Sequence, residues 1–296
     1  MSFQLFQVTS YQSALEQATT YMENNDLWFG HGTDNAWDES VALLLWSAAL
    51  PIDTDSDILE SMLEPEVQER FVAAINRRVD EKIPAAYITQ QAWFQGLPFH
   101  VNKDVLIPRS PIAELIANVF HPWIKIAPEN ILDLCCGSGC IGIATALKFT
   151  RANVVLADLS SAALVVAKNN IERHRCSDRV SIAQGDLFES LQGQAFDLIL
   201  CNPPYVSAED IADLPHEYNH EPSVGLGSGE DGLDLTRKIL EQAPVYLSAQ
   251  GILILEVGNS WGNLEAAYPD HSFLWLDFEN GGEGVCVLTR EELLRL

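Results

Sequence analysis

From Pro108 onward, short apolar runs alternate with segments of helical periodicity, and this alternation restricts the fold more than any other feature of the chain. Such alternation is typical of a parallel sheet whose strands are connected by helical crossovers. The expected strands are residues 130–134, 153–157, 180–183, 196–201, 251–256, 272–278 and 284–289. A turn-rich connection between the last two predicts a terminal antiparallel hairpin. The fold class is therefore α/β, a doubly wound and mostly parallel seven-stranded sheet.

The first third of the chain has a different pattern. Apolar residues recur at helical spacing over residues 11–22, 40–49 and 65–79, without any strand signal. Short apolar runs broken by turn residues follow, and they predict a β-hairpin. We therefore expect a helical domain over residues 1–91, a β-hairpin linker over 92–107 and the α/β domain over 108–296.

Composition excludes several classes of protein. With 17 Lys and Arg against 42 Asp and Glu, the formal charge is −25, which repels nucleic acid phosphates and attracts a basic protein. Residues 41–50 form the longest nearly apolar run, too short for the ~20 residues of a membrane span. Residues 1–17 lack the pattern of a signal peptide, and the six cysteines do not suggest a disulfide framework. We expect a cytoplasmic protein whose partners are neither nucleic acids nor membranes.

A glycine-rich loop follows the first expected strand. Gly137, Gly139 and Gly142 match the pattern G-x-G-x-x-G at the start of a helix. Such a loop can hold the pyrophosphate of a dinucleotide at the helix N-terminus. It can equally hold S-adenosylmethionine, whose methionine part needs a close backbone free of side chains. The loop by itself leaves both cofactors open.

Three carboxylates lie near this loop, and two of them help to choose between the cofactors. Asp158 ends the second strand, where a carboxylate can accept both ribose hydroxyls of either cofactor. Asp186, after the third strand, suits the adenine amino group, and Asp133, near the end of the first strand, suits an ammonium or sulfonium group. Carboxylates around the ligand favour the cationic S-adenosylmethionine over a cofactor with two phosphates.

The segment Asn202-Pro203-Pro204-Tyr205 follows the fourth strand, at the sheet edge where open α/β sheets bind ligands. Proline fixes the backbone and leaves carbonyl groups free as acceptors. The Asn202 side-chain oxygen and the Pro203 carbonyl can together accept both hydrogens of a planar NH₂ group, and Tyr205 can cover its flat face. The segment predicts a catalytic site for transfer to a carboxamide or amine.

A competing motif lies in residues 216–220, whose sequence His-Glu-Tyr-Asn-His matches the zinc-protease pattern H-E-x-x-H. That chemistry needs a continuous helix with both imidazoles on one face. Pro215 and Pro222 bracket the segment and leave fewer than two turns. We expect a substrate-side loop with a helical turn here, and no metal site.

Taken together, these residues resemble the S-adenosylmethionine-dependent protein glutamine methyltransferases, the HemK/PrmC/PrmB group. The resemblance covers nearly the whole chain and includes residues 84–88, residues 105–109, the glycine loop and Asn-Pro-Pro-Tyr. It implies that residues 1–91 recognise the substrate and that 108–296 form a class I (Rossmann-like) methyltransferase domain. Implied cofactor contacts are Asp133, Cys135, Gly137, Ser138, Gly139, Asp158, Asp186, Leu187 and Asn202.

Within the group, residues 30–39, 108–115 and 214–222 are similar to the PrmB branch, which methylates a glutamine of the large-subunit ribosomal protein L-three. The release-factor branch is expected to carry Pro-Asp-Thr-Glu after Arg109, where this chain has Ser-Pro-Ile-Ala. The alternatives are a release-factor methyltransferase, a nucleic-acid amino methyltransferase, a non-catalytic ribosome assembly factor that binds the methyl donor, and a nicotinamide oxidoreductase.

Overall fold

The structure is a computed structural model that describes residues 2–5 and 9–296. The chain divides into two compact units, Met1–Ala92 with Pro215–His220, and Trp93–Leu214 with Glu221–Leu296. Residues 92–107 were expected to form a separate linker, but all of them except Ala92 belong to the second unit. None of the helices in the described ranges is long and apolar enough to cross a bilayer.

The first unit is helical. Its elements are α1 (Tyr11–Glu23), α2 (Ala36–Ser47), η1 (Ser56–Glu60), α3 (Pro65–Asp80), α4 (Ala85–Thr89) and η3 (His216–His220). Helix α2 begins earlier than its apolar spacing indicated, because the Asn35 side chain accepts a hydrogen bond from the Asp38 N–H at 2.8 Å and caps the helix. Buried residues such as Leu15, Leu43 and Phe71 form the core of this unit.

The second unit contains the sheet and the helices that cover it. Its strands are β1 (Gln91–Phe94), which begins in the first unit, β2 (Leu97–His100), β3 (Asn130–Leu134), β4 (Asn153–Asp158), β5 (Val180–Gln184), β6 (Phe196–Cys201), β7 (Leu247–Glu256), β8 (Leu274–Trp275) and β9 (Val285–Thr289). Its helices are α5 (Ile112–Ala117), α6 (Cys140–Lys148), α7 (Ser161–Arg173), α8 (Ala208–Asp213), α9 (Asp234–Tyr246), α10 (Trp261–Ala267) and α11 (Arg290–Leu293). Short 3₁₀ turns are η2 (Glu189–Leu191), η4 (Ser223–Gly225) and η5 (Gly258–Ser260).

Strands β1 and β2 form a two-stranded hairpin, and the other seven form one sheet in the order β5-β4-β3-β6-β7-β9-β8. The pairs from β5 to β7 are parallel, and β9 is antiparallel to β7 and to β8. This arrangement confirms the predicted seven-stranded class. Strand β8 is shorter than residues 272–278, for which the sequence predicted a strand.

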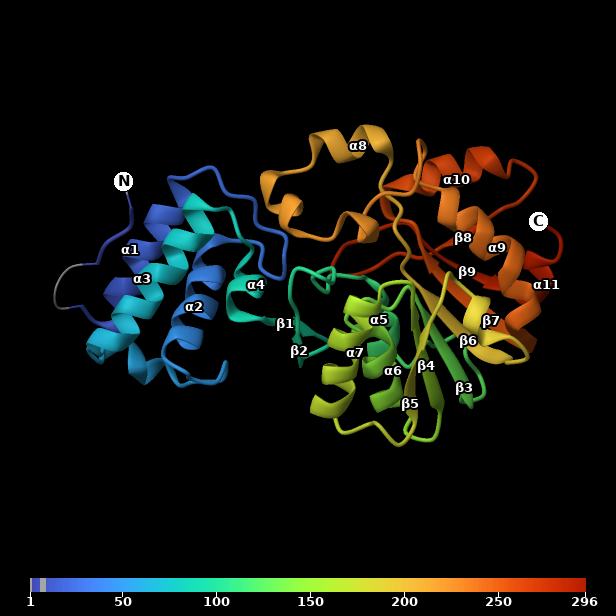
Figure 1. Ribbon diagram of the computed structural model, residues 1–296, viewed down its shortest axis with the longest axis horizontal. Coiled ribbons are helices and arrows are strands. Elements are labelled where there is room, and N and C mark those ends of the chain that lie inside the picture. Colours follow the sequence, from blue (N-terminus) through green and yellow to red (C-terminus); the bar gives the residue numbers. More distant parts are fainter. Residues whose placement is uncertain (1, 6–8) are drawn as a thin grey trace. The chain divides into compact units, whose positions relative to one another are not determined.

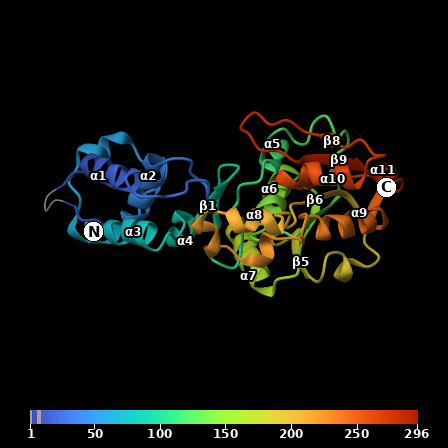
Figure 2. The same ribbon diagram turned by 90° about the horizontal axis from the view of Figure 1, so that it is seen from above.

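Successive residues of β3 belong to two separate cores, because neighbouring side chains of a strand point to opposite faces of the sheet. Ile131 belongs to a core with residues of α5, α6 and α7, whereas Leu132 belongs to a core with residues of α9, α10 and α11. Figures 1 and 2 show these two groups of helices on either side of the sheet. The doubly wound arrangement brings the carboxyl ends of β3, β4, β5 and β6 to one edge.

Candidate active site

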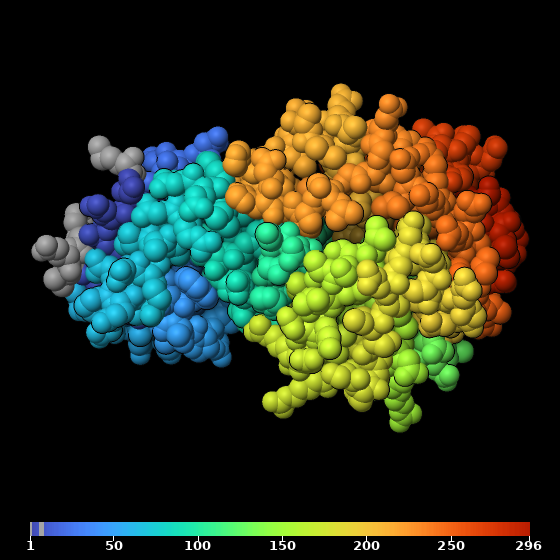
Figure 3. Space-filling view, viewed as in Figure 1, coloured from blue at the N-terminus to red at the C-terminus, as the bar shows by residue number. Residues whose placement is uncertain are grey.

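A cavity lies at this edge of the sheet. Its walls include residues that directly follow β3, β4, β5 and β6, together with residues 104–110, Pro222, Val224 and Gly225. In the space-filling view, the orange surface near residue 225 lies beside the yellow-green surface near residue 160, and both segments contribute to the cavity (Figure 3). The candidate site residues that line it are Cys135, Gly137, Ser138, Asp158, Asp186, Leu187, Asn202 and Pro204.

The glycine loop turns sharply between β3 and α6. Gly137 and Gly139 have positive φ angles of 51° and 76°, a conformation that glycine adopts without steric penalty. Gly137 lines the cavity, but Gly139 does not, and its Cβ position faces Leu156 instead. Gly142 lies deeper, where a Cβ atom would come within 2.3 Å of Leu156 Cδ2. The three glycines therefore have separate roles, at the cavity, in the turn and in helix–strand packing.

Asp158 ends β4 and lines the cavity. Its Oδ2 accepts a hydrogen bond from the Gly137 N–H at 2.9 Å, and its Oδ1 accepts one from the Ser160 N–H at 2.8 Å. Burial raises the pKa of this carboxyl group, and the backbone hydrogen bonds oppose the rise. Each oxygen keeps a second lone pair, so the carboxylate can still accept the two hydroxyls of a ribose.

Asp133 lies elsewhere than the sequence suggested. Its side chain is 1% exposed, does not line the cavity, and accepts a hydrogen bond from the Gly142 N–H at 2.7 Å. Burial raises its pKa to about 7, the negative charge of Asp158 adds to the rise, and the Gly142 bond opposes it. In this structure Asp133 holds the start of α6 against β3.

Asp186 and Leu187 follow β5, and both line the cavity. Asp186 is exposed, whereas Leu187 is 6% exposed and has a positive φ of 49°. The pair therefore presents a carboxylate at the rim and an apolar surface inside.

A second cavity adjoins the first, and the two share Leu106, Arg109 and Asn202. Tyr205 and Glu256 line only this second cavity. Pro203 is buried and borders neither, whereas Pro204 borders the first. Asn202 therefore lies where the two spaces meet, at the carboxyl end of β6.

Arg109 also stands at this junction, and its position was not anticipated from the sequence. Its guanidinium makes two hydrogen bonds of 2.7 Å to the Glu221 carboxylate, whose side chain is 0% exposed. Glu221 Oε1 also accepts the Ile107 N–H at 3.0 Å. The pair ties residues 107–109 to the segment after η3. A buried acidic partner 112 residues away gives no local sequence signal.

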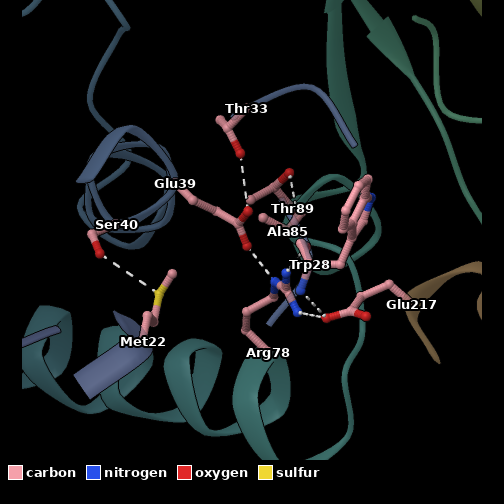
Figure 4. Close-up of polar contacts among 9 residues, drawn as sticks. All are labelled: Met22, Trp28, Thr33, Glu39, Ser40, Arg78, Ala85, Thr89 and Glu217. Atoms are coloured by element: carbon pink, nitrogen blue, oxygen red, sulfur yellow. Dashed lines mark hydrogen bonds and ion pairs between the residues drawn. The ribbon is translucent and has the colours of Figure 1, made fainter. Parts of the chain in front are cut away.

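Glu217, the glutamate of the H-E-x-x-H motif, belongs to the helical unit. Its carboxylate accepts hydrogen bonds from Arg78 at 2.9 Å and from the Trp28 N–H at 3.0 Å. Arg78 also pairs with Glu39 and donates to the Trp28 carbonyl at 2.6 Å. Figure 4 shows the guanidinium between the two carboxylates. This glutamate is thus part of a buried ionic network.

A mostly parallel sheet in this order, with a glycine loop after β3 and a carboxylate at the end of β4, defines a class I methyltransferase. Residues 113–217 match the family described as Methyltransferase small domain. The hMettl16 catalytic domain, solved in complex with a 3′UTR hairpin, has a TM-score of 0.50 at 16% identity, covering 77% of this chain and 82% of that one. At this identity the likeness shows the fold alone.

Two relatives identify the family. A ribosomal protein uL3 glutamine methyltransferase from Francisella tularensis is 46% identical over 276 residues, covering 93% of this chain and 88% of the relative. One from Bordetella pertussis is 47% identical over 266 residues, covering 89% of each. The chain belongs to the family of ribosomal protein uL3 glutamine methyltransferases, and the resemblance stated from the sequence is confirmed.

Proposed function

We propose that this chain transfers a methyl group from S-adenosylmethionine to the side-chain amide nitrogen of a glutamine in ribosomal protein uL3. The observation that carries the proposal is the position of Asn202, which borders both cavities at the carboxyl end of β6. Direct transfer requires donor and acceptor to meet at one point. An amide oxygen at that point can orient the acceptor nitrogen.

The first cavity suits the methyl donor. Asp158 keeps lone pairs for the ribose hydroxyls, Gly137 offers backbone without a side chain, and Asp186 and Leu187 provide a carboxylate and an apolar wall for the adenine. When bound, S-adenosylmethionine supplies an electrophilic methyl group on a positively charged sulfur. Acidic side chains around the cavity favour that charge.

The second cavity suits the glutamine carboxamide. An amide nitrogen is a weak nucleophile because its lone pair is delocalised into the carbonyl group. In our proposal, the Asn202 side-chain oxygen accepts one N–H group of the carboxamide. The carbonyl of the adjoining Pro203, a residue that borders neither cavity before the substrate binds, accepts the other, so that the lone pair turns toward the donor while the Tyr205 ring covers the flat face. Alignment of this kind can supply about 7–11 kcal/mol of barrier lowering. Each acceptor adds about 1–3 kcal/mol, and the nitrogen's surplus proton leaves to water.

The charge of the chain supports a basic substrate. A formal charge of −25 attracts a basic ribosomal protein and disfavours direct binding to nucleic acid. We place the reaction in the cytoplasm, where a ribosomal protein meets such an enzyme. The family of the relatives favours uL3 over a release factor as the substrate.

The test is a transfer assay with methyl-labelled S-adenosylmethionine. Undermodified uL3 and an undermodified release factor are offered in separate reactions, and the labelled peptide is identified by mass spectrometry. We expect label on one glutamine of uL3 and none on the release factor. Label on the release factor alone overturns the assignment of uL3 as the substrate. Binding of the donor without any methyl transfer overturns the assignment of this chain as an enzyme.

A further inference from the structure

Glu256 is a buried carboxyl group next to the proposed reaction point. It is the last residue of β7, which pairs with β6 in a register that places Leu255 opposite Cys201. One position further along, Glu256 ends β7 and Asn202 directly follows β6, and both residues line the second cavity. Glu256 is 4% exposed. A carboxyl group so far from water needs specific partners to be tolerated.

Both oxygens of Glu256 have such partners. Oε1 accepts a hydrogen bond from the Tyr205 hydroxyl at 3.2 Å, and Oε2 accepts one from the Ser110 hydroxyl. Burial nevertheless raises the pKa of Glu256 to about 7, although the hydrogen bonds from Ser110 and Tyr205 and the charge of Arg109 oppose the rise. A neutral side chain would be easier to bury here. What a glutamate adds is two acceptor oxygens, one for the Tyr205 hydroxyl and one for the Ser110 hydroxyl.

The segment that continues from Glu256 holds the rest of Tyr205. A Cβ atom on Gly258 would come within 2.4 Å of Tyr205 Cε2, so only a glycine lets the ring lie this close. The Ser260 hydroxyl donates to the Tyr205 carbonyl at 2.6 Å. Hydroxyl, ring and backbone of Tyr205 are therefore each fixed by the residues that end or directly follow β7.

We infer that Glu256 is a positioning residue for methyl transfer: by accepting the Tyr205 hydroxyl, it holds the aromatic ring against the wall of the cavity that takes the glutamine carboxamide. The inference rests on the proposed function, because it assigns the second cavity to the substrate. Glu256 acts through Tyr205, and its removal lets the ring rotate away and leaves the carboxamide without a fixed surface.

The experiment compares Glu256→Gln and Glu256→Met with the native side chain, in the wild-type protein and in a Tyr205→Phe background. Gln keeps one acceptor oxygen, whereas Met has similar length and no oxygen. With Tyr205 present, kcat for uL3 methylation should fall from the native chain to Glu256→Gln and further to Glu256→Met, by roughly tenfold to a hundredfold in total. With Tyr205→Phe, the three side chains should give the same kcat within about twofold, because no hydroxyl remains to be held.

Donor affinity measured by calorimetry should stay within about twofold in all variants, which separates positioning from loss of the donor site. Glu241→Gln, an exposed glutamate on α9, controls for the change in charge. If Glu256→Met does not fold, the comparison of the native chain with Glu256→Gln in both backgrounds still shows whether the effect of Glu256 on kcat depends on the Tyr205 hydroxyl.

Persistence of the full kcat difference in the Tyr205→Phe background overturns the inference and leaves the proposed function intact. Absence of any methyl transfer by the wild-type chain overturns both.

Discussion

Arg78 and Glu217 are 139 positions apart in the sequence, yet the Arg78 Nη1 donates to the Glu217 Oε1 at 2.9 Å in the interior of the helical unit. The side chains are 1% and 3% exposed. Hydrogen bonds from Trp28 and Arg78 hold the pKa of Glu217 below its usual value, although burial acts in the opposite direction. The pair attaches residues 215–220 to helix α3.

Replacement of Arg78 by alanine should destabilise the helical unit strongly. It leaves Glu39 and Glu217 as buried carboxylates without their cation, and breaking a buried pair in this way typically costs about 3–5 kcal/mol. The free energy of unfolding, measured with urea, checks the prediction. Arg77→Ala, at an exposed position on the same helix, should change it by less than about 0.5 kcal/mol. Equal effects of the two substitutions would show that the network does not stabilise the fold.

Asn202→Ala should lower kcat for uL3 methylation by roughly a hundredfold or more while donor affinity changes little, because in our proposal the lost oxygen orients the glutamine nitrogen. Single-turnover kinetics and a calorimetric titration measure the two quantities. Asn153→Ala, at the start of β4 and far along the strand from its carboxyl end, serves as the control and should leave kcat unchanged. Parallel losses of kcat and donor affinity would mean that Asn202 supports the fold of the site and does not orient the substrate.

Gly142→Ala should destabilise the second unit by about 1–3 kcal/mol, since the added methyl group would meet Leu156 and the Asp133 Cβ at 2.3 Å and 2.8 Å. Gly262→Ala makes the same change on α10, where nothing lies within 4 Å. It should be neutral or stabilise by up to ~1 kcal/mol. Thermal unfolding of both variants checks the contrast. A Gly142→Ala protein as stable as the wild type would refute the close packing of α6 on β4.

Stability should fall as the pH rises toward 7. Burial raises the pKa of Asp133 and of Glu256 to about 7 from ordinary values of 3.8 and 4.5. A group with a raised folded-state pKa binds its proton more tightly in the folded protein, so its contribution is present below the ordinary pKa and is lost as the pH passes about 7. Between the ordinary pKa and about 7, each group can lower the free energy of unfolding by up to about 1.4 kcal/mol per pH unit.

Asp133→Asn isolates one of these two groups, because an asparagine oxygen can still accept the Gly142 N–H. Urea titrations between pH 4.5 and 8 should show a shallower loss of stability in the variant than in the wild type. An unchanged pH slope would contradict a protonated Asp133 in the folded chain.

Association with uL3 should slow steeply as salt rises, if the charge of −25 guides a basic substrate to the enzyme. Stopped-flow association rates at increasing ionic strength measure this, and transfer to a short uncharged glutamine peptide provides the comparison. A flat salt response for uL3 would exclude electrostatic guidance.

Local sequence was sufficient for most of the fold and for part of the site. Alternation of apolar runs with helical segments specified the sheet, because strand and helix periods are properties of neighbouring residues. The structure brings Gly137, Asp158, Asp186, Leu187 and Asn202 together around one cavity, since the carboxyl ends of parallel strands meet at one edge of the sheet. The length of strand β8 was overestimated, because apolar composition alone does not reveal where the pairing of two strands ends.

Tertiary structure decided which charged groups line the cavities and which are bound by other groups of the protein. Asp133 was expected at the cofactor, whereas Glu217 lies in a zinc-like motif that the flanking prolines argued against. Asp133 accepts the Gly142 N–H, and Glu217 binds Arg78. Conversely, Glu256 and the Arg109–Glu221 pair were not singled out, and they line or brace the cavities. The partners of a buried charge come from distant segments, and only the packed chain brings them within hydrogen-bonding distance.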